Sequence, residues 1–134
     1  YFQDRLVLSS EVFNSTGQGI LVTAVNGKIK KANPAFTKLT GIDEEDVIGQ
    51  NPSMMKSERQ SKNFYQNMWK DIQEHGMWQG EIWNKRKSGE EYLQWLNISA
   101  VKDDTGENVR YVGTFTDITS EIEKKGGFER VPLS

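Results

Sequence analysis

The stretch Trp78-Gln79-Gly80-Glu81-Ile82-Trp83-Asn84-Lys85 decides the fold of this chain, because the hydrophobic pattern changes at its first residue. Before it, Ser61 to Glu74 has apolar residues at steps of three and four, which predicts the longest helix. From Trp78 onward the period is two, which predicts a strand. Two more strand candidates follow after short turns, at Tyr92 to Val101 and Val109 to Phe115. Turns this short join antiparallel strands, so we expect an antiparallel meander.

The N-terminal half is predicted to add a hairpin and two short helices. Asn26-Gly27, a strong hairpin signal, separates the strand candidates Gly19 to Val25 and Lys28 to Ala32. Asn33 before Pro34 predicts a helix start, and Gly41 its end. Asp43 and Gly49 bound a second short helix in the same way. The expected fold class is α+β, with five antiparallel strands, helices inserted between strands two and three, and flanking helices at Asp4 to Thr16 and Thr119 to Lys125.

The composition predicts one domain with one modest, aromatic-rich core. A chain of 134 residues buries roughly two-thirds of its unfolded surface. Only 35% of the residues are hydrophobic, but four Trp, four Tyr and six Phe supply large apolar areas. The net charge is -2, and the basic runs Lys28 to Lys31 and Lys85 to Lys87 sit beside acids or inside a probable hairpin, so a nucleic-acid partner is disfavoured.

The absence of cysteine excludes disulfides, thiolate metal sites and cysteine nucleophiles. No run approaches the roughly 20 apolar residues of a membrane span, so we expect a soluble, cytoplasmic domain without a membrane partner. Tyr1-Phe2-Gln3 resembles the end of a protease-cleavage tag and Gly126-Gly127 a linker start. The chain is therefore expected to be part of a longer protein.

Two carboxamides are predicted to point into the core. Alternation places Asn84 on the inner face of its strand together with Trp78 and Ile82, and Gln94 on the inner face of the next strand. A buried amide without a partner costs about 1 to 3 kcal/mol, so each must be hydrogen-bonded. A planar heterocyclic ligand would satisfy them, and so would loop backbone or a buried water.

Six short motifs, taken as a set and at their spacing, resemble the PAS domain family over about Val12 to Glu123. They are Asn33-Pro34-Ala35-Phe36, Thr40-Gly41, Val47-Ile48-Gly49, Trp78-Gln79-Gly80-Glu81, Asn84-Lys85-Arg86-Lys87-Ser88-Gly89 and Asp117-Ile118-Thr119. The resemblance implies a sensor that holds a small ligand between its sheet and its helices. It divides the chain into a lead-in helix (1–11), the sensor domain (12–123) and a linker or tail (124–134).

Within this family, Asn84 and Gln94 match the amides through which flavin-binding members contact the isoalloxazine ring. The blue-light branch has a photoreactive cysteine where this chain has Pro52, and a glutamine where it has Phe115. Covalent blue-light photochemistry is therefore excluded.

A closer resemblance is to the FAD-binding, redox-sensing PAS domain of nitrogen-fixation regulators. Trp69, Trp78 and Asn84 match residues of that domain, whereas its acidic cofactor contact falls at Pro52. The resemblance implies FAD as the leading cofactor candidate, with Asn84, Trp69, Gln94 and Trp78 as binding residues. For Trp69 alone, its helical spacing favours an ordinary core position over a flavin contact.

Other cofactors and catalysis are disfavoured. Haem needs an axial ligand, but His75 falls at a helix end, and the family's haem ligand would fall near Gln60. Methionines are better read as fillers of irregular space. No catalytic triad, metal-ligand cluster or phosphate-binding glycine loop is present, so we expect no enzymatic activity in this domain.

Trp83 and Trp95 are predicted on the outer face of the sheet, which suggests an interface. A flanking helix of the same chain would also cover them. Two hypotheses therefore remain, a ligand sensor and a cofactor-free module for homodimerisation and relay. By the resemblance, Asp117-Ile118-Thr119 leads to an output domain in the same polypeptide, a histidine kinase, diguanylate cyclase or phosphodiesterase, and the pattern from Trp78 to Val101 most resembles bacterial cyclic-di-GMP proteins.

Overall fold

The structure, a computed structural model, describes residues 10–120 of the chain. The predicted lead-in helix is described from its seventh residue onward, as α2 (Ser10–Ser15). The predicted exit helix begins at Thr119 as expected, and its residues after Ser120 lie outside the described part. The linker or tail at 124–134 also lies outside it.

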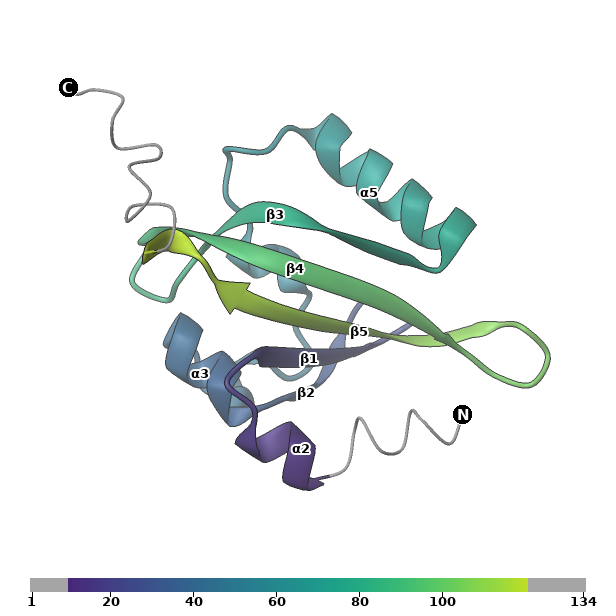
Figure 1. Ribbon diagram of the computed structural model, residues 1–134, viewed down its shortest axis with the longest axis horizontal. Coiled ribbons are helices and arrows are strands. Elements are labelled where there is room, and N and C mark those ends of the chain that lie inside the picture. Colours follow the sequence, from purple (N-terminus) through teal and green to yellow (C-terminus); the bar gives the residue numbers. More distant parts are fainter. Residues whose placement is uncertain (1–9, 121–134) are drawn as a thin grey trace.

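The described residues form one five-stranded antiparallel sheet (Figure 1). Its strands are β1 (Gly19–Ala24), β2 (Ile29–Ala32), β3 (Met77–Lys85), β4 (Glu91–Lys102) and β5 (Asn108–Asp117). The order across the sheet is β2-β1-β5-β4-β3. The last strand thus lies in the centre and joins the N-terminal hairpin to the β3–β4 hairpin.

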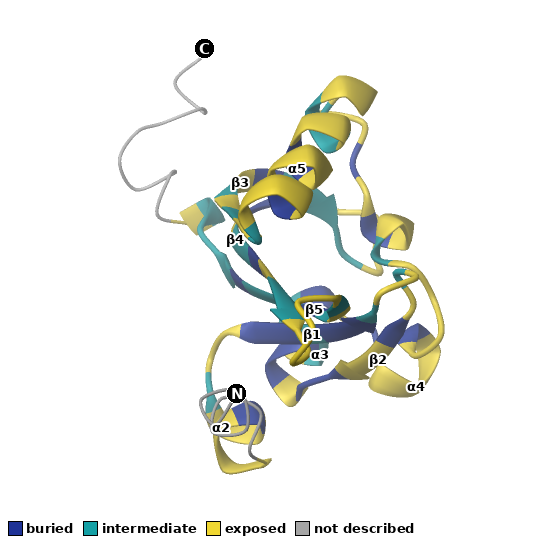
Figure 2. Cartoon of the chain, turned by 90° about the vertical axis from the view of Figure 1, so that its right-hand side faces the viewer, coloured by how far each residue is buried: buried dark blue, intermediate teal, exposed yellow. Residues whose placement is uncertain are grey.

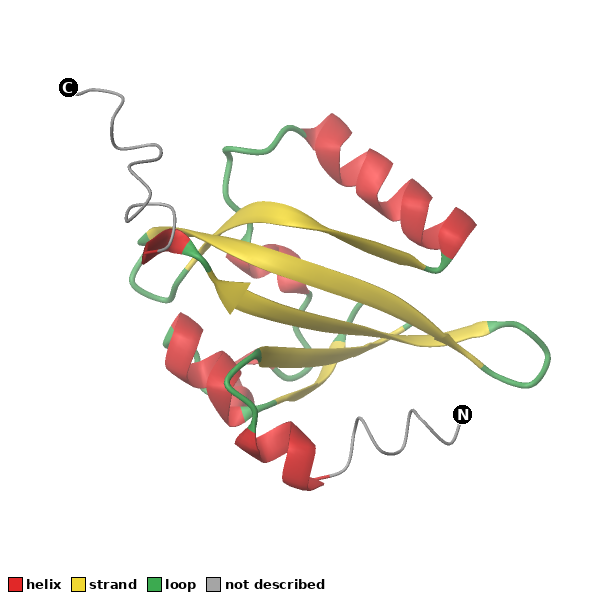
Figure 3. Ribbon diagram, in the orientation of Figure 1, coloured by secondary structure: helices red, strands yellow, loops and turns green. Residues whose placement is uncertain are grey.

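The segment between β2 and β3 contains the helices predicted there and one more (Figure 3). They are α3 (Pro34–Thr40), α4 (Glu44–Val47), η1 (Pro52–Met55) and α5 (Lys62–His75). The local sequence explains the ends of α5: Ser61 Oγ accepts from Phe64 N–H, and Gly76 supplies the left-handed residue with φ 82°. The single turn η1 is too short for a periodic signal and was not predicted. Its Asn51 cap accepts from Ser53 N–H at 2.9 Å.

Asn33, which is 1% exposed, connects three elements through hydrogen bonds of its side chain. Its Oδ1 accepts from Ile20 N–H at 2.8 Å and from Phe36 N–H at 3.0 Å, which links β1 to the start of α3. Its Nδ2 donates to the carbonyls of Phe13 at 3.0 Å and Gln18 at 2.9 Å, which fixes α2. One amide therefore satisfies buried backbone groups of α2, β1 and α3.

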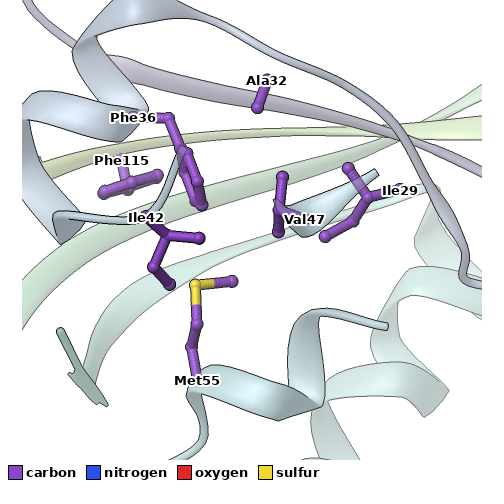
Figure 4. Close-up of a cluster of buried hydrophobic side chains, with 7 residues drawn as sticks. All are labelled: Ile29, Ala32, Phe36, Ile42, Val47, Met55 and Phe115. Carbon is purple, nitrogen blue, oxygen red and sulfur yellow. The ribbon is translucent and has the colours of Figure 1, made fainter. Parts of the chain in front are cut away.

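The apolar core is divided between the two ends of the sheet's inner face. One cluster joins α3, α4 and η1 to the sheet, with Met55 pointing toward Ile42 (Figure 4). A second lies under α5 and contains Met68 and Ile72, as the helical stripe predicted. In Figure 2, β1 is mostly buried and α5 presents an exposed outer surface. No helix in residues 10–120 is long and apolar enough to span a bilayer.

Candidate functional site

A cavity of about 330 Å³ lies between the inner face of the sheet, η1 and α5. Its interior includes the buried side chains of Ile82, Tyr92, Gln94 and Phe115. Its rim is formed by exposed lining residues of the two helices and the loop between them, namely Asn51, Ser53, Lys56 and Trp69. The cavity is therefore enclosed by the sheet and open on the η1–α5 side.

Asn84 and Gln94 meet in the wall of this cavity, as alternation predicted. They lie diagonally across the β3–β4 pair, where Asn84 is opposite Tyr92 and Ile82 is opposite Gln94. The neighbours of Asn84 fix its amide orientation: the nitrogen faces the carbonyls of Met55 at 3.2 Å and Trp83 at 3.0 Å, and the oxygen accepts from Gln94 Nε2 at 3.2 Å. Backbone carbonyls, one of the alternatives weighed from the sequence, thus pair with Asn84, whereas Gln94 pairs with the side chains of Asn84 and Tyr92.

The amide pair keeps unused hydrogen-bonding capacity. Gln94 Oε1 accepts from the hydroxyl of Tyr92 at 2.8 Å, and Gln94 Nε2 uses one of its two hydrogens on Asn84. Among the hydrogen bonds of residues 10–120, the second Nε2 hydrogen and one lone pair of Asn84 Oδ1 remain. A donor and an acceptor are therefore available to a molecule in the cavity that both residues line.

Tyr92 connects the amide pair to Arg86. Its ring is 1% exposed and burial raises the pKa of its hydroxyl, so the group stays a neutral donor at physiological pH. The guanidinium carbon of Arg86 lies 4.2 Å from the centroid of this ring, a cation–π contact. The side of Tyr92 away from the cavity thus carries a positive charge.

Arg86 joins the β3–β4 turn to the end of β5 and to α3. Its Nη2 donates to Asp117 Oδ2 at 2.7 Å and its Nη1 to the carbonyl of Leu39. Burial would raise the pKa of Asp117, but the hydrogen bonds from Arg86 and from Thr119 N–H outweigh it and hold the pKa below its usual value. Thr119 Oγ1 in turn accepts from Leu93 N–H at 2.9 Å. The predicted output junction, Asp117-Ile118-Thr119, is therefore fixed to the sheet by side chains.

Three aromatic side chains form an adjoining wall. Tyr65 and Trp69 lie one turn apart on α5, and the Trp69 ring meets Tyr111 of β5 edge to face at 5.3 Å. The Tyr65 hydroxyl accepts from Gln60 Nε2 at 2.9 Å, and burial raises its pKa. A flat ring bound against this wall would have aromatic contacts on one side and carboxamides near its edge.

Trp69 and Trp78, the two tryptophans predicted to bind the cofactor, lie in different surroundings. Trp69 lines the cavity and is 40% exposed, so it is a rim residue and the core reading of its spacing was wrong. Trp78 does lie on the inner face, but its ring packs against Phe64 at 5.9 Å and it is not among the residues that line the cavity. Phe64 of α5 covers Trp78, which the sequence could not indicate.

Neither His75 nor Gln60, the two positions weighed for a haem ligand, is among the residues that line the cavity. His75 is exposed at the end of α5, and Gln60 is engaged with the backbone of Trp83 and with Tyr65. Met55 and Met68 line the cavity, as the filling role predicted for the methionines requires, but that prediction was wrong for Met54 and Met77, which are exposed. Within residues 10–120, no group of three His, Cys, Asp or Glu could hold a metal ion.

Among residues 10–120, helix α2 covers the β1 end of the outer face of the sheet. There Phe13 of α2 packs on Ile20 and Val22. Trp95, 38% exposed, and Trp83 lie on the outer face of the β4–β3 side, and Arg59 stacks on the Trp83 ring at 4.0 Å. The described helix α2 thus does not cover the pair.

Comparison with known proteins agrees with this geometry. The PAS domain family model matches residues 17–120, so the chain belongs to the PAS domain family. Members of this family are sensor domains, and the domain is a sensor and not an enzyme. The α+β architecture predicted from the sequence is confirmed.

The chain is 32% identical over 100 residues to the nitrogen fixation regulatory protein of Klebsiella oxytoca, covering 75% of this chain and 20% of the relative. It is 30% identical over 93 residues to a blue-light-activated histidine kinase of Brucella anthropi, covering 69% of this chain and 19% of that protein. It thus spans about a fifth of the length of these relatives. A solved Light-Oxygen-Voltage domain, studied with a flavin analogue, shares the fold with a TM-score of 0.74 at 20% identity, over 93% of this chain and 90% of that one.

Proposed function

We propose that the cavity binds a planar heterocyclic ligand, with FAD as the leading candidate, and that the domain relays the ligand's state to an output domain in the same polypeptide. The observation that carries the proposal is the continuous set of contacts from Asn84 and Gln94 through Tyr92 and Arg86 to Asp117. It begins in the cavity wall and ends at the last strand's exit.

The residues present suit a flavin ring. Its edge carries hydrogen-bond acceptors and an N–H, which match the unused donor of Gln94 and acceptor of Asn84. Trp69 and Tyr65 offer aromatic contact beside it. Ligand pockets start at about 300 Å³, so a cavity of about 330 Å³ holds the ring system, and the remainder of FAD would extend past the rim. A bound flavin would supply redox-dependent protonation at the ring edge.

The relay acts through neighbouring hydrogen bonds. A change in what the ring edge donates or accepts alters the bonds of Gln94 Nε2, and hence the position at which Gln94 Oε1 receives the Tyr92 hydroxyl. A shift of the Tyr92 ring moves the surface on which the Arg86 guanidinium stacks, and Arg86 in turn donates to Asp117. Because Asp117 Oδ1 also accepts from Thr119 N–H at 3.0 Å, the change reaches the start of the exit helix.

The test is an absorption spectrum of freshly purified protein, followed by identification of any flavin released on denaturation. The proposal expects flavin absorption, or uptake of added FAD by colourless protein. The Asn84→Leu variant should bind about tenfold more weakly, because one hydrogen bond is worth about 1.4 kcal/mol in this range. Gln79→Leu, on the outward face of the same strand, is the matched control. Protein that is colourless, releases no flavin and takes up none contradicts the proposal.

A second function, a cofactor-free module for homodimerisation and relay, is favoured by the exposed Trp95 on the outer sheet face. Sedimentation analysis over a range of concentrations tests it. Dimers that dissociate on Trp95→Ser substitution support it, and a monomer at every concentration with both flanking helices present contradicts it.

The nature of the output domain also belongs to the proposal. A histidine kinase is supported by the name of one relative, while a diguanylate cyclase or phosphodiesterase comes from the sequence resemblance alone. The sequence of the full-length protein would decide between these three kinds of output domain.

A further inference from the structure

The charges of the side chains that line the cavity indicate which kind of ligand it accepts. Among its lining residues the single charged side chain is Lys56, and none carries a carboxylate. The other polar lining groups are neutral amides and hydroxyls, such as Asn51 and Ser53 at the rim. The side chains that line the opening therefore carry a net positive charge.

The backbone holds Lys56 firmly at this opening. Its N–H donates to the carbonyl of Ser53 at 3.0 Å, and its main chain forms an antiparallel bridge to Asn84. The residues on either side, Met55 and Ser57, are buried. The lysine is thus fixed beside the amide pair while its own side chain reaches the rim.

The ammonium group of Lys56 lies 5.1 Å from the ring centroid of Tyr65. In the described part of the chain, no carboxylate is paired with it. The nearby acids have other partners: Glu58 accepts from Lys85 at 3.0 Å, and Glu91 accepts from Arg59 at 2.9 Å and from Ser57. A cation on an aromatic ring at a cavity opening, without a counter-ion, is suited to a ligand's anionic group.

We infer that the ligand carries an anionic substituent, a phosphate or carboxylate, which Lys56 binds at the rim while the planar part meets Asn84 and Gln94 inside. This deepens the proposed function and rests on the same cavity. Among flavins it selects phosphorylated forms over riboflavin, since only the former place negative charge outside the ring system.

Two matched pairs of probes test the inference. The first is FMN against riboflavin, which lacks the phosphate. The second is 8-anilinonaphthalene-1-sulfonate against N-phenyl-1-naphthylamine, which lacks the sulfonate and needs no flavin site. Dissociation constants are measured by fluorescence for the wild type, Lys56→Met, Lys56→Arg and Lys70→Met. Lys70 is exposed on α5 and does not line the cavity, so it is the control for general loss of charge.

Lys56→Met should weaken both anionic probes about tenfold and change the neutral probes less than about twofold. Lys56→Arg should keep the wild-type affinities, and Lys70→Met should leave all four unchanged. Equal weakening of anionic and neutral probes by Lys56→Met, or no change in either, overturns the inference. A wild type that binds neither naphthalene probe also overturns it. Sulfonate selectivity without any flavin binding keeps the inference and refutes the flavin proposal.

Discussion

Replacing Asn84 with leucine removes the amide at nearly constant volume and tests whether the wall of the cavity is built on it. The substitution leaves the Met55 carbonyl and one hydrogen of Gln94 Nε2 without their partner, both on buried residues. Each such loss costs about 1 to 3 kcal/mol, and burial of the added apolar surface offsets part of it. We expect a net destabilisation of about 2 to 3 kcal/mol.

Equilibrium urea unfolding of the unliganded protein measures this difference directly. In a domain of 134 residues it should also lower Tm by about 6 to 15 °C, at about 3 to 5 °C per kcal/mol. Asn97→Leu is the matched control, because Asn97 lies on the outer face of β4 and its side chain makes no hydrogen bond among residues 10–120. That variant should stay within about 0.5 kcal/mol of the wild type.

A double-mutant cycle with Gln94→Leu extends the test. If the two amides support each other, their coupling energy should be about 1 to 2 kcal/mol. A single-mutant effect of Asn84→Leu below about 0.5 kcal/mol, equal to that of the Asn97 control, would refute the assignment of these hydrogen bonds and with it the first step of the relay.

Three further substitutions have distinct expected outcomes. Asn33→Ala should destabilise the domain by about 3 to 5 kcal/mol in urea unfolding, because four backbone groups lose their partner, and an effect below about 1 kcal/mol would contradict that account. At pH values above the ordinary aspartate pKa of 3.8, the Asp117→Asn variant should be less stable than the wild type. This difference in stability should vanish as the pH falls through the pKa of Asp117 in the folded protein, which is lower. A difference that does not depend on pH would exclude the ion pair between Asp117 and Arg86 as the cause. Gly113→Leu should fill the cavity and abolish ligand-induced stabilisation in thermal shift assays. Gly113→Ala, whose Cβ would meet Leu96 at 3.8 Å, should keep this stabilisation. Ligand binding by the leucine variant would place the ligand outside the cavity.

The sequence was informative where a local rule decides the structure. Alternation along β3 and β4 was enough to predict that Asn84 and Gln94 point inward, and the predicted caps Asn33 and Gly41 mark the ends of α3. The direction of a side chain is a local property, but its surroundings are not. Helical spacing therefore could not show that Trp69 faces an opening, nor could alternation show that Phe64 covers Trp78.

Arg86 and Lys56 were beyond prediction for a related reason. Arg86 contacts groups 31 and 47 residues away, at Asp117 and Leu39, and no periodic pattern records such pairs. Lys56 follows a single helical turn that carries no periodic signal, and its significance depends on which carboxylates pair elsewhere. A weak signal did exist for Tyr65, which stands four residues before Trp69 and so shares its side of α5.

The central place of β5 governs how the domain assembles. During synthesis the β1–β2 and β3–β4 hairpins emerge first, yet they lie on opposite sides of the strand that is made last. Until residues 108–117 leave the ribosome, each hairpin has an open edge capable of pairing with another chain. Nascent chains ending before Asn108 should therefore aggregate, and folding should be completed in one late, cooperative step when this strand inserts.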